Sequence, residues 1–396
     1  MIPRILTPYL TRDAAFNPVV TLTGPRQSGK TTLARAAFPT HAYVTLEELD
    51  TRTFAREDPR GFLARFDGPV VIDEAQLVPD LISYIQAAVD RVLTPGRFIL
   101  TGSQNLLLIE RVAQSLAGRT AILHLLPFSR TELERQAQPE SSSPDRLFGN
   151  RTSRLDCWET IRTGFYPPVH DRGVAPENWY SDYFRTYVER DVRTLVNIGD
   201  LAAFERFLKL CAGRIGQLLN ISSLASDCGI AVDTARRWMS VLETSFIIFL
   251  LAPHHRNFHK RLIKSPKLYF HDTGLACVLL GIRTTGQIEA NPLRGALFEN
   301  HVVAEVMKAY WNHRRTPPVS FWRDRTGHEV DLVIEDGNFL YPIEIKSGAT
   351  LASDMFSGLA WFKALAGDAV GPATLVYAGP DAHERAGVAV RPWFSI

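Results

Sequence analysis

The first third of the chain alternates short apolar runs with stretches of helical periodicity. The pattern predicts four buried strands, at Pro18–Thr23, Ala42–Leu46, Val70–Asp73 and Phe98–Gly102, and two helices, at Lys30–Ala37 and Pro79–Leu93. Strands that alternate with helices of this length are typical of a parallel α/β sheet. The pattern ends near Pro127, and the following segment 136–153, rich in Ser, Pro and charge, is typical of a linker.

Helical patterning dominates the middle of the chain. Trp179–Val196 has aromatic residues spaced between charges, which predicts an amphipathic helix. A short helix from Ile221, a turn at Cys228-Gly229-Ile230 and a helix over Val232–Leu242 have the spacing of a helix-turn-helix. We therefore expect a mainly helical middle region.

The last third returns to an α/β pattern. A helix is predicted at Leu297–Tyr310, and strands at Ser320–Arg323, Glu329–Glu335 and Phe339–Lys346. The dipeptide Asp336-Gly337 favours a tight turn between the last two strands. The whole chain is therefore predicted to be an α/β protein with a helical region between two sheets.

Composition narrows the class of protein. The 396 residues are 45% hydrophobic and 22% charged, which excludes a wholly disordered chain. The net charge is +2, too small for the chain as a whole to be attracted to DNA or to an anionic membrane. The longest clean apolar run, Ser245–Ala252, is far shorter than the ~20 residues that span a bilayer. The four cysteines are solitary, which fits a reducing compartment. We expect a soluble, cytoplasmic, multidomain protein without membrane partners.

The octet GPRQSGKT at Gly24–Thr31 matches the phosphate-binding pattern G-x-x-x-x-G-K-[ST] and lies between a predicted strand and helix. Backbone N–H groups of such a loop turn toward phosphate oxygens, and the helix N-terminus adds partial positive charge. Lys30 is predicted to contact the β- and γ-phosphates, and the Thr31 hydroxyl to bind Mg²⁺. The predicted ATP-binding residues are Gly24, Gln27, Ser28, Gly29, Lys30, Thr31 and Thr32.

A second motif, VVIDEAQ, places two carboxylates at the end of an apolar strand. We expect Asp73 to hold Mg²⁺ through water and Glu74 to polarise the attacking water. The later run FILTGSQ ends in Ser103 and Gln104, either of which is a candidate contact to the γ-phosphate or the water. A strand intervenes between the loop and the Asp-Glu pair, as in AAA-type and related ATPases.

Arg119, in the sequence LAGR, is a candidate sensor or arginine finger. A guanidinium stabilises the charge that spreads over a transferring phosphoryl group. The alternative is a surface arginine after a glycine turn. If Arg119 acts on a neighbouring subunit, the protein must form a homo-oligomer.

The helix-turn-helix region is locally basic. Residues 205–270 contain ten Lys and Arg against four Asp and Glu. The second helix offers Arg236 and Arg237, and the segment His254–Lys267 adds Lys260, Lys264 and other cations in what resembles the wing of a winged helix. Such a strip is expected to bind DNA chiefly by counterion release, although winged helices also bind proteins.

Three acids and a lysine in the last third have the order of a PD-(D/E)xK nuclease. Asp331 lies in GHEVDLV, Glu344 and Lys346 lie in PIEIKS, and Glu299 lies on the preceding helix. Glu344 and Lys346 share one face of a strand because they are two residues apart. We predict that the three carboxylates gather around Mg²⁺ beside the ammonium. The alternative is an exposed strand with no chemistry, and a nuclease-type fold does not require cleavage activity.

The motifs GPRQSGKTT, VVIDEAQ, FILTGSQ, LAGR, WYSDYFRTYVERDVR, KSPKLYFHDTGLA and GHEVDLVI…YPIEIKS occur in this order. Together they resemble a widespread prokaryotic family of AAA-like P-loop ATPases with a domain of unknown function after the ATPase. The resemblance implies a winged helix combined with a restriction-endonuclease-like fold, and ATP binding and hydrolysis at Lys30, Thr31, Asp73 and Glu74. It leaves the biological role open, between DNA processing and signalling.

Two details qualify this resemblance. The family often has Ile at the position of Ala75, a small departure after the Asp-Glu pair. The segment Asp182–Asp191 resembles a family signature, for which packing near the nucleotide or a partner subunit is the only role we can suggest.

These observations predict four regions: an AAA-like ATPase domain at 1–135, a linker and helical connector at 136–200, a basic winged-helix-like domain at 201–285, and a nuclease-like α/β domain at 286–396. The predicted function is an ATPase whose nucleotide state controls a DNA-binding, nuclease-like half. The alternative is a nucleotide-dependent switch or scaffold that binds protein partners. A GTPase is disfavoured, since no NKxD motif follows the predicted sheet.

Overall fold

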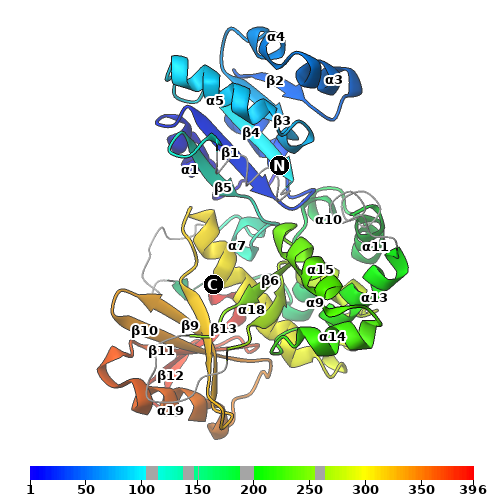
Figure 1. Ribbon diagram of the computed structural model, residues 1–396. Helices are drawn as coiled ribbons and strands as arrows, with labels where there is room; N and C mark the ends of the chain where they lie inside the picture. Colours follow the sequence, from blue (N-terminus) through cyan, green and yellow to red (C-terminus); the bar gives the residue numbers. More distant parts are fainter. Residues whose placement is uncertain (104–114, 137–146, 150, 188–199, 255–263) are drawn as a thin grey trace. The chain divides into compact units, whose positions relative to one another are not determined.

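The computed structural model describes residues 1–103, 115–136, 147–149, 151–187, 200–254 and 264–396. The chain divides into two compact units (Figure 1). The first comprises Met1–Phe128 with the short segments Thr244–Phe246 and Trp311–Arg315. The remainder, Ser129–Glu243, Ile247–Tyr310 and Thr316–Ile396, forms the second.

A five-stranded parallel sheet forms the centre of the first unit. Its strands are β1 (Val19–Gly24), β2 (Ala42–Thr45), β3 (Val70–Asp73), β4 (Phe98–Ser103) and β5 (Thr120–His124), in the order β2-β3-β4-β1-β5. All neighbouring pairs are parallel. The prediction of a parallel α/β sheet is confirmed. Strand β4 lies between the strand that leads into the phosphate loop and the strand that ends in Asp73.

Both faces of this sheet are buried. Val70 and Ile72 of β3 pack in one apolar cluster with Leu81 and Ile82, whereas Val71 packs in another with Leu33. Alternate residues of a strand point to opposite faces, so the continuous apolar run VVI matches a strand covered on both sides. The helices of this unit are α1 (Thr7–Ala14), α2 (Lys30–Ala37), α3 (Leu49–Glu57), α4 (Pro59–Ala64) and α5 (Leu81–Arg91).

The helical part of the second unit ends in a two-stranded antiparallel ribbon. Its helices are α7 (Arg130–Leu133), α9 (Cys157–Thr163), α10 (Pro167–Asp171), α11 (Pro176–Tyr187), α13 (Leu201–Ala212), α14 (Ile221–Cys228) and α15 (Val232–Thr244). Strand β6 (Ile248–Leu251) pairs antiparallel with β7 (Lys267–Phe270). The predicted helix-turn-helix is present: α14 ends at Gly229, whose left-handed φ of 72° lets the chain turn into α15.

A six-stranded mixed sheet completes the second unit, in the order β12-β13-β11-β10-β9-β8. The strands are β8 (Val319–Arg323), β9 (Glu329–Asp336), β10 (Phe339–Lys346), β11 (Ala373–Tyr377), β12 (His383–Arg385) and β13 (Val388–Pro392). Strands β8, β9 and β10 are the predicted antiparallel meander, and β11 adds to β10 in parallel. The helices α16 (Thr273–Leu279), α17 (Thr285–Glu289), α18 (Arg294–Asn312) and α19 (Ser357–Ala366) belong to the same stretch of chain.

An apolar core joins the helical part of the second unit to the mixed sheet, and a further apolar cluster packs α19 on the same sheet. Phe207 of α13, Phe270 of β7, Phe298 of α18 and Ile345 of β10 belong to a single cluster of buried side chains. Because the helical part and the mixed sheet share this core, we expect the second unit to unfold as one cooperative body.

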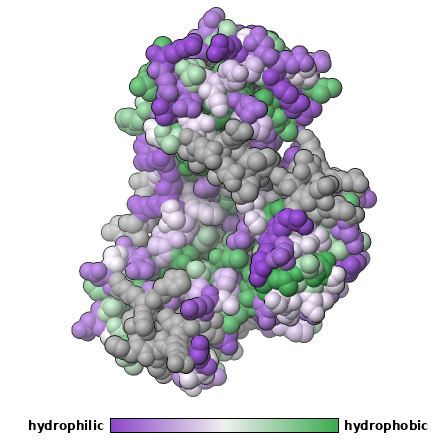
Figure 2. Space-filling model, in the orientation of Figure 1, coloured by the Kyte–Doolittle hydropathy of each residue, from purple (hydrophilic) through white to green (hydrophobic). Residues whose placement is uncertain are grey.

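The surface view shows hydrophilic residues interspersed with apolar ones across the visible face (Figure 2). Among the described residues, no helix combines the length and apolar character that a membrane crossing requires.

Candidate nucleotide site and carboxylate cluster

The phosphate loop connects β1 to α2 and depends on two glycines. Gly29 caps α2 with a left-handed φ of 95°, which disfavours a side chain there. A Cβ on Gly24 would lie 2.1 Å from the backbone oxygen of Leu125. The sequence motif therefore reflects a backbone that only glycine can follow at these two positions.

Lys30 is folded back into this loop. Its side chain is buried, and Nζ donates to the backbone oxygens of Gly24 at 3.0 Å and Pro25 at 2.7 Å. The ammonium is therefore held within the curve of the loop, where a phosphate chain would bring negative charge. Of the other predicted loop residues, Ser28 is buried, whereas Gln27 and Thr32 are exposed.

Asp73 accepts hydrogen bonds from three elements. The Thr31 hydroxyl lies 3.0 Å from both carboxylate oxygens, and the Tyr43 hydroxyl donates to Oδ2 at 2.9 Å. The Thr101 hydroxyl donates to Oδ1. A hydroxyl beside a carboxylate is the oxygen donor set that Mg²⁺ prefers, so Thr31 and Asp73 fit the cation that an ATPase requires.

Glu74 follows directly, in a left-handed backbone conformation with φ of 57°. Its carboxylate accepts a hydrogen bond from Gln76, whose amide also donates to the Ser103 hydroxyl at 2.9 Å. Ser103 therefore lies beside Glu74, and its predicted contact with the γ-phosphate or the water stays a prediction. Gln104 lies outside the described residues.

Arg119 is not brought to this site within the chain. It precedes β5, whose first residue pairs with Val19 at the start of β1, whereas the phosphate loop follows the end of β1. Five residues along the strand separate the two edges, roughly 17 Å. The guanidinium instead bonds Asp90, with Nη2 at 3.1 Å from Oδ2. The expectation of a sensor in the same chain is therefore wrong, because the parallel strand order sets Arg119 at the opposite edge of the sheet.

Several residues that no sequence motif indicated support the site. Arg4 donates to the backbone oxygen of Ser28 at 2.9 Å and to that of Leu126 at 2.6 Å, so it braces the phosphate loop. Tyr43 and Thr101 hold Asp73 from neighbouring strands. No short motif marks these three residues, because each depends on strand order rather than on spacing along the chain.

Tyr43→Phe should raise the Mg²⁺ concentration that nucleotide binding requires for half-saturation. The phenol holds Oδ2 of Asp73 in place, and loss of one such hydrogen bond costs about 1 kcal/mol, equivalent to roughly fivefold in the Mg²⁺ concentration at half-saturation. The measurement is binding of a fluorescent ATP analogue over a Mg²⁺ series, with Tyr84→Phe as control. An unchanged Mg²⁺ midpoint would show that Tyr43 is not a positioning residue.

The second unit gathers the predicted nuclease-like residues around a lysine that the sequence analysis assigned elsewhere. Glu299, Asp331, Glu344 and Lys346 line one open cavity of about 570 Å³, together with Lys267, Arg323 and Glu329. We call Glu299, Glu329, Asp331 and Glu344 with Lys267 the carboxylate cluster.

Lys267 is the centre of the carboxylate cluster. Its side chain is 3% exposed, and Nζ lies 2.9 Å from Oε1 of Glu299 and 3.9 Å from Oδ1 of Asp331, and also pairs with Glu329. Lys346 pairs with Glu344 and lies 3.9 Å from Oδ2 of Asp331. The sequence analysis placed Lys267 in an exposed basic wing, which is wrong because β7 carries it into the core.

Burial and mutual repulsion perturb these acids. Burial, together with the charge of Asp331, raises the pKa of Glu299 to about 7 and that of Glu344 to about 8, despite the neighbouring lysines. Burial alone would lower the pKa of Lys267, but the surrounding carboxylates outweigh it and the pKa rises. The ammonium of Lys267 is therefore the stable charge of the cluster.

The predicted metal site at Glu299, Asp331 and Glu344 is not borne out. In the described part of the chain, no group of three or more His, Cys, Asp or Glu side chains is arranged to hold a metal ion. The acids converge as the motif predicted, but the ammonium of Lys267 lies among them. The ammonium therefore supplies the positive charge that a metal ion would bring to these carboxylates.

The predicted DNA-contacting residues lie in different settings. Arg236 and Arg237 are exposed on α15, and Arg236 pairs with Asp233 at 2.7 Å. Lys264 is exposed shortly before β7, whereas Lys260 lies outside the described residues. The basic segment connects the paired strands β6 and β7, the topology that a wing requires.

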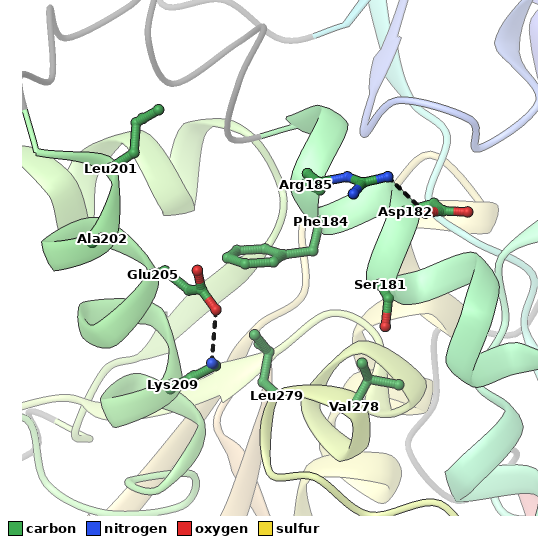
Figure 3. A pocket seen from close by; sticks show the side chains of 10 residues that line it. All are labelled: Ser181, Asp182, Phe184, Arg185, Leu201, Ala202, Glu205, Lys209, Val278 and Leu279. Atoms are coloured by element: carbon green, nitrogen blue, oxygen red, sulfur yellow. Dashed lines mark hydrogen bonds and ion pairs between the residues drawn. The ribbon is translucent and has the colours of Figure 1, made fainter.

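A second cavity, of about 580 Å³, lies between α11, α13 and α16 (Figure 3). Phe184, Leu201 and Leu279 supply apolar walls, and the charged side chains are paired with each other: Arg185 with Asp182 at 3.4 Å, and Lys209 with Glu205 at 2.7 Å. Asp182, Phe184 and Arg185 of the Asp182–Asp191 segment thus line a cavity, and residues 188–191 lie outside the described part. Paired charges beside apolar walls give no catalytic group here.

Comparison with known proteins assigns three consecutive regions. Residues 16–134 match an AAA domain, residues 154–286 match a domain of unknown function (DUF8612), and residues 294–394 match another domain of unknown function (DUF4143). The first match agrees with the parallel sheet and phosphate loop, so the first unit is an AAA-type P-loop ATPase domain.

Similar structures include the Walker-type ATPase PABY2304 of Pyrococcus abyssi, 16% identical, with a TM-score of 0.41 and coverage of 69% of this chain and 94% of that one. The RuvB Holliday junction branch migration motor of Thermotoga maritima is 19% identical, with a TM-score of 0.30 and coverage of 63% and 88%. At these scores neither likeness supports a functional inference.

Two curated relatives match most of the chain. The uncharacterized proteins Rv2008c of Mycobacterium tuberculosis and Mb2031c of Mycobacterium bovis are each 33% identical over 337 residues, covering 84% of this chain and 71% of the relative. This level of identity extends well beyond the AAA domain. An AAA domain precedes two domains of unknown function in this chain, and the chain belongs to the family of these mycobacterial proteins.

Proposed function

We propose that the protein binds and hydrolyses ATP with Mg²⁺ at the nucleotide site of the first unit. The observation that carries this proposal is the hydrogen bonding of Thr31 to Asp73 beside the loop-bound ammonium of Lys30. These groups belong to two sequence motifs, and their proximity supports a phosphate-binding loop with Mg²⁺ ligands beside it.

Each residue has a distinct task in this proposal. Lys30 neutralises the β- and γ-phosphates, and Thr31 and Asp73 hold Mg²⁺, which balances the phosphate charge when bound. Glu74 orients and polarises the attacking water, with Ser103 and Gln76 fixing its carboxylate. Arg119 contributes only to a neighbouring subunit, if the protein assembles as a homo-oligomer.

The direct test is ATP turnover by the purified full chain in Mg²⁺, measured as phosphate release. Turnover should be lost in EDTA and in Lys30→Ala. A wild-type protein that binds no ATP and releases no phosphate would overturn the proposal. The same assay with single-stranded, duplex and branched DNA tests whether nucleic acid controls the ATPase.

DNA binding by the second unit is a second candidate function. It is supported by the α14–Gly229–α15 turn, by the exposed Arg236 and Arg237, and by a basic connection between β6 and β7. We propose that nucleotide state controls this binding. Cleavage is not part of the proposal, since Lys267 occupies the nuclease-like centre.

If these cations contact phosphates, Arg236→Ala, Arg237→Ala, Lys260→Ala and Lys264→Ala should each flatten the dependence of DNA affinity on salt. Each lost phosphate contact lowers the slope of log affinity against log salt by about one. Fluorescence anisotropy with duplex DNA from low to moderate salt gives the slope, and Arg325→Ala, outside the helix-turn-helix, is the control. Affinity that is absent or insensitive to salt would favour the protein-binding switch.

A further inference from the structure

The carboxylate cluster brings together the acids of the nuclease motif, but they surround an ammonium. Three of its acids occupy the helix and strand positions that the nuclease motif requires, and Glu329 adds a fourth carboxylate from β9. In nuclease sites such a set of oxygens balances a metal ion. Here the ammonium of Lys267 lies 2.9 Å from Glu299 and 3.9 Å from Asp331.

Lys267 is fixed in this position from outside the mixed sheet. It begins β7, which pairs with β6, and the Tyr269 hydroxyl two residues later donates to the same Glu299 carboxylate. Asn300 lies next to Glu299. Its Oδ1 accepts from the backbone N–H of Phe270 at 2.7 Å, and its Nδ2 donates to the backbone oxygen of Phe270 at 2.9 Å. These bonds hold β7 against α18 and so keep the backbone of Lys267 beside the acids.

The charges around Lys267 are arranged in two layers. The central ammonium is 3% exposed, whereas Lys346 and Arg323 are about one-third exposed and pair with Glu344 and Glu329 at the rim of the cavity. A buried ammonium is stable only when carboxylates compensate it, and buried carboxylates likewise need a cation. The cluster is therefore neutralised by side chains of this chain.

We propose that Lys267 is the resident cation of the carboxylate cluster and takes the place of the divalent metal of nuclease sites. Two consequences follow. The wild-type second unit folds and keeps its structure without a divalent ion at this cluster. Removal of the ammonium leaves four acids around a vacated centre, which converts the cluster into a divalent-cation site.

The test is titration of nucleotide-free protein with Mn²⁺, followed by calorimetry or electron paramagnetic resonance. All proteins carry Thr31→Ala, which weakens the nucleotide-site background. The protein that keeps Lys267 should show no Mn²⁺ binding that is lost on Asp331→Asn. Lys267→Met, which keeps the length of the apolar stem, should gain one site at sub-millimolar Mn²⁺, and Lys267→Met with Asp331→Asn should lose it.

Thermal unfolding supplies a second measurement. Lys267→Met should melt roughly 5 °C or more below the parent in EDTA, because a buried charge loses its partner, and Mn²⁺ should recover part of that loss. The parent should melt at the same temperature in EDTA and Mn²⁺. Lys267→Arg, which keeps the charge, should gain no Mn²⁺ site.

Two results would overturn the proposal. One is a Mn²⁺ site in the parent that Asp331→Asn abolishes, since the metal would then coexist with or displace Lys267. The other is a folded Lys267→Met that gains no Mn²⁺ affinity. If Lys267→Met does not fold, the Mn²⁺ affinity of the parent is compared with that of the parent carrying Asp331→Asn. Equal Mn²⁺ affinity in these two proteins supports the proposal. None of these measurements depends on ATP hydrolysis.

Discussion

Glu74→Gln should leave ATP bound but lower its turnover by about 10²- to 10⁴-fold, the usual contribution of a general base. The amide keeps the shape of the side chain and its contacts with Gln76 and Ser103, but it no longer polarises water. Phosphate release and binding of a fluorescent ATP analogue measure the two quantities separately.

Lys30→Ala should behave differently, because Lys30 acts on the phosphates in both ground and transition states. We expect nucleotide affinity and turnover to fall together. Glu57→Gln, an exposed acid on α3 of the same unit, should change neither. Normal turnover in Glu74→Gln would remove Glu74 from the role of water activation while leaving the nucleotide site itself in place.

The stability of the second unit should fall as pH rises from about 6.5 to 8. Below pH 6.5 the buried His301, whose pKa burial lowers to about 4, acts in the opposite direction. Glu344 has an ordinary pKa of 4.5 when unfolded, but burial and Asp331 raise its pKa to about 8 in the folded state. Between these two values the Glu344 carboxyl binds more protons in the folded chain than in the unfolded chain, so its contribution to the free energy of unfolding decreases with pH. Glu299, with its pKa raised to about 7, acts in the same direction.

We expect a loss of roughly 2 kcal/mol from pH 6.5 to 8, since one bound proton over one pH unit corresponds to about 1.4 kcal/mol and the two acids share neighbours. Urea unfolding at three pH values between 6.5 and 8 gives the slope. Glu344→Gln should flatten it, whereas Glu335→Gln, an exposed acid on β9, should not. A free energy of unfolding that rises with pH in the wild type would contradict this assignment.

Local patterns determined the nucleotide site to a large extent. The order strand, phosphate loop and helix places Lys30 and Thr31 at a helix N-terminus whatever the rest of the fold, and VVIDEAQ places its acids at the end of a buried strand. Parallel strands bring such ends to one edge, so Thr31 and Asp73 meet as expected. The three-strand meander and the helix-turn-helix followed from period and turn residues in the same way.

Tertiary structure decided where separated polar groups met. Arg119 followed a glycine turn in a plausible motif, but the strand order set it at the far edge of the sheet beside Asp90. Tyr43 and Arg4 joined the site with no spacing that marks them. Contacts of this kind depend on which strands become neighbours, and hydrophobic periodicity does not encode that choice.

Lys267 shows the same division most clearly. In the sequence it closes a basic run, and charge patterning alone assigns it to a solvated surface. In the structure it begins the strand β7, whose pairing with β6 and bonds to Asn300 carry it among acids from α18, β9 and β10. The sequence by itself determined that the acids would converge. Only the tertiary structure decided which cation neutralises them, because a charge is buried by its neighbours in space and not by its neighbours along the chain.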